Sequence, residues 1–521
     1  MRILLVSPAS NASLIALTEV GDITGHHSYM PNLALPTLAA LAPDDVEITI
    51  VDEQVTPIDF TQHWDLVGIT GYTTHQRRML DIADEFRRRG QLVAIGGPYA
   101  SLSPGHVRPH TDILFVGEAE ETWPQFLREF RAGYWQPEYR AVSAIDLRFS
   151  PVPDIQKLPL DAYLAGVVQT SRGCPFECDF CDVIIYLGRK QRHKSAERVI
   201  QELEQWYEAG YRSVFLSDDN FTVNRRHATE VMTAIAAWNQ SVSEPIDFYT
   251  QFSIDIARDQ DTELLELCAR AGLKQAFIGL ESPNADALRE VKKRQNLRSD
   301  LIADVHRVQQ HGIVVQAGII TGFDADTSAS FRSTFEFLQE AGIPIVIVNI
   351  MQAPQGTSLA DRLLREGRLI PQPFAEHKPT HFHTNIIAKG MSHHELVAGT
   401  VWLLNRLYAP EMFLERCRVL AKNLPESHTP ARTSRRALEV WQRLLASYTA
   451  LGPEFSELPR QVLKLFRHRE TQGIGTALIH YKHVVATLRR DALWNSELGQ
   501  RETPDFSIHL PDSDIEEASH A

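Results

Sequence analysis

Three of the chain's five cysteines lie within eight residues, at Cys174, Cys178 and Cys181. Thiolates are soft ligands that select zinc, copper(I) or iron–sulfur clusters. A structural zinc site needs four ligands, and the sequence holds no second cysteine pair, so His193 is the nearest candidate for a fourth. Three close thiolates suit a [4Fe–4S] cluster in which one iron has no protein ligand and can bind a substrate or cofactor. The spacing favours such a cluster; zinc with a distant fourth ligand and unligated thiols are the alternatives.

The cysteine segment directly follows the first of six short strands predicted between residues 166 and 360. Helical patterns such as Ser195–Glu208, Asp261–Ala271 and Asp300–Gln310 separate the strands, and a glycine follows each helix. This alternation predicts an open parallel sheet or a barrel shorter than the eightfold one, with its active site at the carboxyl ends of the strands. The predicted strands are Val167–Thr170, Ser213–Leu216, Phe248–Gln251, Ala276–Ile278, Val314–Ile320 and Pro344–Ile350.

Residues 1–133 are predicted to form a separate, small, doubly wound α/β domain. Continuous apolar runs alternate with helical segments such as Arg78–Arg89, as in a parallel sheet covered on both faces. Glycine-rich turns at 68–71, 96–98 and 117–120 stand at the carboxyl ends of strands, where a large ligand could approach the backbone. Glycines that only make turns are the alternative. The apolar runs are Ile3–Val6, Val46–Val51, Leu66–Thr70, Leu92–Ile95 and Ile113–Val116.

The rest of the chain divides by composition. Prolines and weak periodicity mark residues 134–165 as a linker. Helical stripes predict a helical region over 361–500, and residues 501–521 are expected to be a solvated acidic tail. The predicted helices are Glu395–Leu407, Met412–Ala421, Thr433–Tyr448 and Leu458–Arg467.

Charge and hydropathy exclude several classes of protein. Lys plus Arg number 52 and Asp plus Glu number 66, so the net charge of −14 argues against a general nucleic-acid binder. No apolar run approaches the roughly 20 residues that span a bilayer. Ile3–Val6 ends at Ser-Pro and is interpreted as a first strand and not as a signal peptide. We therefore expect a soluble, cytoplasmic protein with no nucleic-acid partner and no transmembrane segment.

The Cys-x3-Cys-x2-Cys spacing, with Phe180 before its last cysteine and Thr170–Pro175 leading into it, resembles the signature of the radical S-adenosylmethionine (radical SAM) superfamily. The resemblance implies a partial (β/α)6 barrel and a [4Fe–4S] cluster on the three cysteines. It also implies an external one-electron reductant, such as flavodoxin or ferredoxin. The reduced cluster would split SAM into methionine and a 5′-deoxyadenosyl radical, which abstracts a hydrogen atom from an unactivated carbon.

Further segments resemble the SAM-binding motifs of that superfamily, each after its expected strand: 217–221, 279–282, 318–324 and 353–357. A carboxylate at Asp218 or Asp219 could hold the SAM ammonium by a charge-assisted hydrogen bond; capping of the strand end is the alternative. The SAM-binding residues implied by the resemblance are Phe180, Asp218, Asp219, Glu281, Ser282, Gly318, Ile320, Gly322 and Pro354.

The N-terminal segments 32–36, 68–70, 96–101 and 116–122 resemble the cobalamin-binding domain that precedes many radical SAM cores. The Asp-x-His-x-x-Gly motif of proteins that ligate cobalt through histidine is absent, so His75 is not expected to bind the metal. The cobalamin-binding residues that this likeness implies are Thr70, Gly71, Thr73, His75, Gly96, Gly97, Gly117 and Glu118.

Residues 384–391 and 404–410 resemble the helical extension of the radical SAM group that includes hopanoid C-2 methylases. Together the likenesses predict a cobalamin-dependent radical SAM enzyme that methylates an unactivated carbon of a small-molecule or lipid-like substrate. One alternative is a radical cyclisation, oxidation or rearrangement on the same scaffold. Another is an iron–sulfur electron carrier or sensor without turnover.

The remaining polar and sulfur residues are expected to be structural. Cys268 and Cys417 lie on apolar helical faces and are predicted to be core. The short basic run Lys292–Arg294 is predicted to be a solvated surface.

Overall fold

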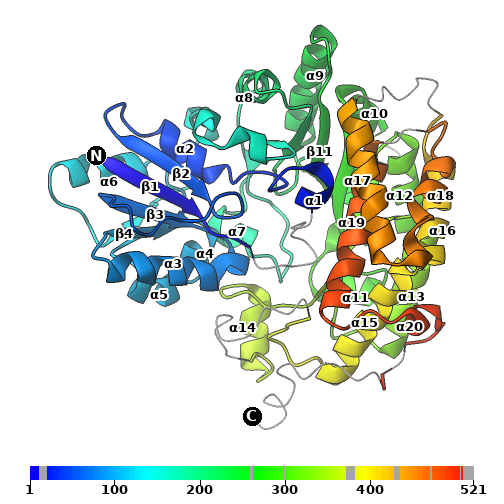
Figure 1. Cartoon of the computed structure of the whole chain (residues 1–521). Coiled ribbons are helices and arrows are strands. Elements are labelled where there is room, and N and C mark those ends of the chain that lie inside the picture. Colours follow the sequence, from blue (N-terminus) through cyan, green and yellow to red (C-terminus); the bar gives the residue numbers. More distant parts are fainter. Residues whose placement is uncertain are drawn as a thin grey trace.

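The computed structural model describes residues 1–10, 20–258, 262–297, 300–370, 382–426, 435–469, 472–504 and 506–507. Two six-stranded sheets, each parallel throughout, carry the site, and Figure 1 shows them in the two halves of the molecule with a helical layer beside the second. Of the predicted acidic tail, residues 501–521, position 505 and all positions from 508 onward lie outside the described residues.

The first sheet has the strand order β2-β1-β3-β4-β5-β6. Along β1, Ile3 and Leu5 face one hydrophobic cluster and Leu4 and Val6 face another. Because side chains alternate across a strand, a continuous apolar run fills the core on both faces, as predicted for a doubly wound domain. The strands are β1 (Arg2–Ser7), β2 (Glu47–Asp52), β3 (Leu66–Thr70), β4 (Val93–Gly96), β5 (Ile113–Val116) and β6 (Glu138–Arg140).

Helices cover both faces of this sheet. Side chains of α2 (Ala34–Ala40) and α6 (Thr122–Arg131) join the cluster of Ile3, whereas α3 (Gln76–Arg88), α4 (Pro98–Leu102) and α5 (Pro104–Val107) join the cluster of Leu4. The short strand β6 falls inside the segment that the sequence predicts as a linker. It pairs with β5 and completes the edge of the sheet. Tyr139 is buried there and stacks on Phe115 of β5.

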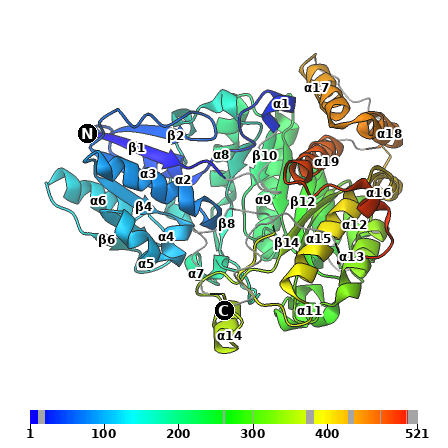
Figure 2. The same cartoon turned by 60° about the horizontal axis from the view of Figure 1, so that its bottom comes forward.

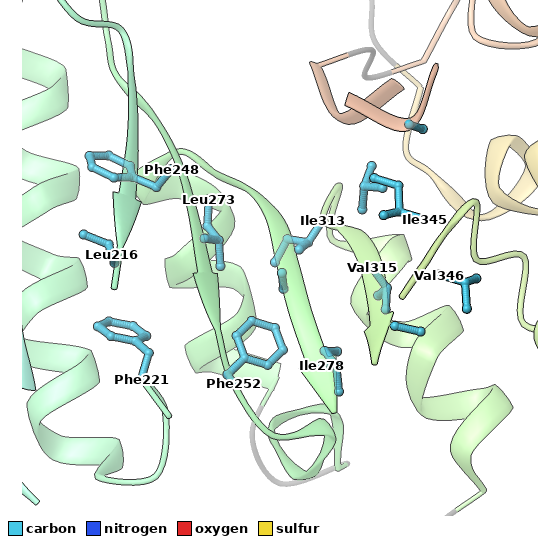
Figure 3. Close-up of a cluster of buried hydrophobic side chains, with 14 of the residues drawn as sticks. Leu216, Phe221, Phe248, Phe252, Leu273, Ile278, Ile313, Val315, Ile345 and Val346 are labelled. Carbon is cyan, nitrogen blue, oxygen red and sulfur yellow. The ribbon is translucent and has the colours of Figure 1, made fainter. Parts of the chain in front are cut away.

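The second sheet runs in sequence order, β7-β10-β11-β12-β13-β14, as in a partial barrel of six strand–helix units. Right-handed crossovers place successive helices on one face of such a sheet. Figure 3 shows the side chains of Phe248, Leu273 and Ile278 in the cluster that joins strands to helices. The strands are β7 (Gly166–Val168), β10 (Ser213–Leu216), β11 (Asp247–Gln251), β12 (Leu273–Glu281), β13 (Val314–Thr321) and β14 (Ile345–Ile350). The helices are α8 (Ala196–Glu208), α9 (Arg225–Ser241), α10 (Thr262–Ala271), α11 (Ala285–Glu290), α12 (Leu301–Gln310), α13 (Ser328–Glu340) and α14 (Ser358–Arg365).

A small antiparallel hairpin, β8 (Ser171–Arg172) with β9 (Arg192–His193), brackets the cysteine loop and the short helix α7 (Val183–Tyr186). In Figure 2, β8 lies between the first sheet and the strands of the second. The loop is therefore held at both ends by one pair of short strands.

The C-terminal region is helical, as predicted: α15 (His393–Tyr408), α16 (Pro410–Asn423), α17 (Arg435–Leu451), α18 (Leu458–Leu465), α19 (Gln472–Arg490) and α20 (Ser496–Gln500). Helix α19 was not among the predicted helices, because polar residues such as His480 and His483 interrupt its apolar stripe; both histidines are buried. Gln275 of β12 donates to Thr476 of α19 at 3.3 Å, so this helix lies against the second sheet. Within the described ranges, no helix is long and apolar enough to cross a membrane.

Candidate functional site

The cysteine loop starts at a glycine that the backbone requires. Gly173 has φ +91°, and a side chain there would lie 2.8 Å from the carbonyl oxygen of Lys190. The loop folds back on itself: the Cys174 amide donates to Gly188 at 3.3 Å, and the Cys181 amide donates to Cys178 at 3.1 Å. The three thiols are thus presented from one short, closed loop at the carboxyl end of β7.

Burial and hydrogen-bond donors act in opposite directions on the thiols of the loop. Burial raises the pKa of the Cys181 thiol to about 12 and also raises that of Cys174, so a bound cation would have to displace their protons. Gln295 donates to the sulfur of Cys178 at 3.6 Å. Backbone N–H groups of Phe176 and Val183 point at the sulfurs of Cys174 and Cys181. Such N–H donors stabilise the thiolate ligands of an iron–sulfur cluster, and the loop fits that group.

The other candidate ligands lie elsewhere. His193, the suggested fourth zinc ligand, packs its ring 4.2 Å from that of His227 and contacts Gln191 at 3.0 Å. Within the described parts of the chain, no three His, Cys, Asp or Glu side chains gather closely enough to surround one metal ion. Cys268 and Cys417 are fully buried in the core, as predicted.

Asp218 and Asp219, predicted together as SAM contacts, have different surroundings. Asp218 is fully buried and accepts from the amides of Thr170 and Ser171, at 2.7 and 3.0 Å, and from both hydroxyls. Its carboxylate therefore holds the strand end that leads into the cysteine loop. Asp219 is half-buried and accepts one bond, from the Gly173 amide at 2.9 Å, which leaves its other oxygen for a ligand. Burial raises its pKa to about 6.

The basic run Lys292–Arg294, predicted to be solvated, is divided by the structure. Lys292 and Arg294 are exposed, but the Lys293 side chain is only 13% exposed and pairs with Glu281 at 2.8 Å. Although desolvation opposes it, Glu281 and the nearby thiols of Cys178 and Cys181 raise the pKa of Lys293. This part of the prediction was wrong because only the fold brings residue 293 back to the cysteine loop. The sequence carried no signal for Lys293 or Gln295.

Glu281 and Ser282 follow a bulge in β12, and Glu281 adopts φ +63°, which is unusual for a residue with a side chain. The bulge turns the carboxylate toward Lys293. Ser282 is buried and accepts from the Asn284 amide at 3.1 Å, so it starts the turn into α11. Both residues stand at the predicted edge, with their polar atoms bonded inside the protein.

The remaining predicted SAM contacts form two groups. Phe180 and Ile320 are partly buried against one hydrophobic cluster that includes Ala353, next to Pro354. The two glycines serve neighbouring side chains: a Cβ at Gly318 would lie 2.7 Å from the Phe277 ring, and one at Gly322 would lie 3.0 Å from Leu396. Each glycine therefore makes room for a neighbouring side chain, and direct contact of SAM with Gly318 or Gly322 stays a prediction.

The C-terminal segment that resembles the methylase extension contacts this apolar cluster. The amide of Asn385 bonds both backbone groups of Ala353, at 2.9 Å each. Thr384 donates to the carbonyl of Met351. Residues 384–386 therefore hold the loop after β14 in place.

Glycine turns dominate the carboxyl edge of the first sheet. Gly97 has φ +92°, and a Cβ there would lie 2.2 Å from the hydroxyl of Thr70. A Cβ at Gly117 would lie 2.9 Å from Ala141, and one at Gly96 would lie 3.1 Å from Phe115. These glycines let strand ends and loops approach closely, which keeps the edge free of large side chains.

His75 lies at this edge beside Gly71 and ends the short turn that Thr73 begins. Its Nδ1 accepts from the Tyr72 amide at 3.1 Å, and its Nε2 contacts the Ser10 hydroxyl at 2.7 Å. Burial lowers its pKa, so the ring is neutral. Both ring nitrogens are bonded within the protein, and the absence of a bond from His75 to cobalt stays a prediction.

Glu118, predicted as a cobalamin contact, is bonded instead to two arginines of the cysteine-loop hairpin. Its carboxylate accepts from Arg172 at 2.9 Å and from Arg192 at 2.6 Å. The side chain is only 6% exposed. Its carboxylate oxygens are thus engaged within the protein, and a direct contact of Glu118 with cobalamin stays a prediction.

Sequence reasoning missed three residues between the two edges. Tyr72 follows β3, whereas Asp182 and Tyr186 belong to the segment after Cys181. The Tyr72 side chain is about half exposed. Desolvation by the surrounding protein raises its pKa, and the negative charges of Asp219 and Asp182 raise it further. Tyr186 has a raised pKa from burial, with added effects of Tyr72 and Asp182. These groups lie together only because the fold opposes the two sheets.

Residues 168–338 match the family model of the radical SAM superfamily, and residues 357–491 match a domain of unknown function, DUF4070. An uncharacterized methyltransferase of Synechocystis is 34% identical over 377 residues, which cover 71% of this chain and 70% of that protein. Hopanoid C-2 methylase of Rhodopseudomonas palustris is 31% identical over 398 residues, covering 75% and 73%. The solved structure of the cobalamin-dependent S-adenosylmethionine radical enzyme OxsB, with aqua-cobalamin and S-adenosylmethionine bound, has a TM-score of 0.58 at 14% identity and covers 94% of this chain and 80% of that one.

Proposed function

The chain belongs to the radical SAM superfamily, in its B12-dependent group, and we propose that it methylates an unactivated carbon of a small-molecule or lipid-like substrate. Its cofactors are a [4Fe–4S] cluster, S-adenosylmethionine and cobalamin. When bound, the cluster gives SAM one electron and cobalamin carries a methyl group.

The observation that carries the proposal is the opposition of the two carboxyl edges. The loop after β5 contacts the hairpin of the cysteine loop through Glu118 and Arg192. The segment after α4 contacts the loop after β14, where Ser103 donates to Gln355 at 2.9 Å. Since parallel sheets bind ligands at these ends, two ligands bound there would face each other across a narrow space.

Each group of residues at the two edges has its own role in this proposal. Cys174, Cys178 and Cys181 hold the cluster, and Asp219 receives the SAM ammonium beside it. Phe180 and Ile320 supply an apolar surface for the adenine. Tyr72, Asp182 and Tyr186 border the space between the edges, where the substrate carbon would lie within reach of both cofactors.

Anaerobic reconstitution tests this proposal. We expect the purified chain to bind about four irons and one hydroxocobalamin, and its reduced cluster to change its electron paramagnetic resonance (EPR) spectrum when SAM is added. With a methyl-labelled SAM and extracts of small molecules and lipids, the label should appear on carbon of a product. A cluster that cleaves SAM in a protein that binds no cobalamin would favour another radical reaction. A cluster that never cleaves SAM would favour an electron carrier.

The external one-electron reductant and the cytoplasmic location stay predictions. A titration with flavodoxin or ferredoxin in place of a chemical reductant would test the first. The identity of the substrate depends on residues between the two edges and on the C-terminal helices.

A further inference from the structure

An ion cluster joins the two sheets where their carboxyl edges meet. It consists of Glu118 and Glu120, in the loop after β5, and Arg172 and Arg192, on the strands β8 and β9. Arg172 donates to Glu118 at 2.9 Å and to Glu120 at 2.6 Å, and Arg192 donates to both oxygens of Glu118, at 2.8 and 2.6 Å. We call these four residues the inter-sheet clamp.

The clamp is buried. The exposed fractions of its side chains are 6% for Glu118, 11% for Glu120, 15% for Arg172 and 10% for Arg192. The two glutamate carboxylates and the two arginine guanidiniums give the clamp a net charge of zero. The two carboxylates outweigh desolvation and raise the pKa of Arg172. Each guanidinium reaches the carboxylates through its Nη1 nitrogen. Such charge-assisted contacts, largely shielded from solvent, fix geometry more tightly than surface ion pairs do, because water competes less for them.

Backbone groups add to the clamp at both ends. The Ile145 amide donates to Glu118 at 3.1 Å, and Arg192 donates to the Ile145 carbonyl at 2.9 Å. Arg192 also donates to the carbonyl of Leu187, inside the cysteine loop, at 2.9 Å. The clamp therefore connects the end of the first sheet directly to the loop that holds the cluster.

The residues of the inter-sheet clamp are neighbours in sequence of both proposed cofactor sites. Glu118 follows Gly117, whose φ of +85° turns the chain at the end of β5. Arg172 stands two residues before Cys174, and Arg192 pairs with it across the hairpin. Any shift of the first sheet against the second would have to break or stretch these bonds.

We propose that the inter-sheet clamp is a positioning element that fixes the separation and orientation of the two cofactor sites. This inference rests on the proposed function, because it needs a ligand at each edge. Without the clamp each cofactor still binds its own residues. The spacing between them varies, and SAM cleavage becomes uncoupled from methyl transfer.

The test uses substitutions on the first-sheet side of the clamp, Glu118→Gln and Glu120→Gln. They leave the bonds of Arg172 to Gln169 and of Arg192 to Leu187 in place, so the cysteine loop keeps its own support. The matched control is Arg87→Gln, which breaks the pair of Arg87, on α3, with Asp112, just before β5, at 3.2 Å, within the N-terminal domain. It removes an ion pair without touching the contact between sheets.

Two readouts separate positioning from stability. In the protein without cofactors, hydrogen exchange of residues 117–122 and 143–147 should be at least about tenfold faster in Glu118→Gln than in the parent or the control. In the reconstituted protein, the reduced cluster should speed the spin relaxation of bound cob(II)alamin in the parent. This effect should fall at least about threefold in Glu118→Gln, with iron and cobalamin contents unchanged.

Each other outcome contradicts the inference in its own way. Loss of cobalamin from Glu118→Gln would make Glu118 a cofactor contact. Unchanged exchange and unchanged relaxation would make the clamp dispensable. Should Glu118→Gln fail to fold, Glu120→Gln removes only the outer carboxylate and should give the same changes at smaller size. A parent protein that binds no cobalamin would instead defeat the proposed function.

Discussion

The two opposed sheet edges hold their predicted ligand-binding residues in different ways. At the second sheet, thiols and carboxylates are set by specific bonds, as when Asp218 fixes Thr170 and Ser171. At the first sheet, glycine turns such as Gly97 and Gly117 keep side chains away. The edge of the second sheet is suited to select a ligand by charge and metal chemistry. The edge of the first sheet is suited to admit a large ligand by shape. Substitutions should therefore act strongly on one edge and weakly on the other.

The largest effect is expected at the cysteines. Replacing Cys174, Cys178 or Cys181 singly with Ala removes one thiolate from an iron, so the cluster and all SAM cleavage should be lost. Iron content and the visible spectrum measure the loss of the cluster, and the yield of 5′-deoxyadenosine measures the loss of SAM cleavage. Cys268→Ala, in the core, is the control and should keep the cluster. A full [4Fe–4S] spectrum from Cys181→Ala would overturn the ligand assignment.

The neighbouring carboxylates give the next contrast. Asp218→Ala leaves buried donors of Thr170 and Ser171 without a partner, which should cost about 2–4 kcal/mol of unfolding free energy and lower cluster content. Asp219→Ala should keep stability and cluster but weaken SAM binding about ten- to a hundredfold, since one charge-assisted hydrogen bond is lost. Denaturant unfolding measures the change in unfolding free energy, and a SAM titration measures the change in SAM affinity. The reverse pattern would exchange the roles assigned to the two residues.

The pH dependence of SAM binding is a smaller effect at the same edge. Burial raises the pKa of Asp219 to about 6, so its carboxylate is charged above that pH and protonated below it. SAM affinity should be constant above about pH 7 and fall as the pH drops through 6, because the neutral acid attracts the ammonium less. Asp219→Asn should remove this dependence. An equally steep pH profile in that variant would assign the titration to another group.

The smallest effect is expected at His75. Both its ring nitrogens are bonded within the protein, so His75→Ala should change cobalamin affinity less than about threefold. The spectrum of bound cob(II)alamin should show no nitrogen ligand from the protein in either form. A nitrogen coupling that disappears in His75→Ala would mean that the ring turns to bind cobalt.

Much of the fold follows from the sequence, because local patterns determine it. Apolar runs marked the strands of both sheets, apart from the short β6, and Ser195 and Asp300 were placed at the starts of their helices, where they cap α8 and α12. The cysteine loop was found because three ligands lie within one short segment.

The parts that sequence reasoning missed depend on contacts between distant segments. Lys293 pairs with Glu281, Glu118 reaches Arg172, and Asn385 holds Ala353. A glycine can also make room for a side chain from a distant segment, as Gly318 does for Phe277. Residue type alone gives no sign of such partners.

One measurement addresses the joint use of both edges most directly: counting the two products of SAM in the chain loaded with cluster and cobalamin and reduced anaerobically. We expect both 5′-deoxyadenosine and S-adenosylhomocysteine, because one SAM is cleaved to a radical and another gives up its methyl group. Cys181→Ala should form no 5′-deoxyadenosine. Formation of 5′-deoxyadenosine alone by the loaded parent, with no S-adenosylhomocysteine under any substrate tested, would contradict methyl transfer.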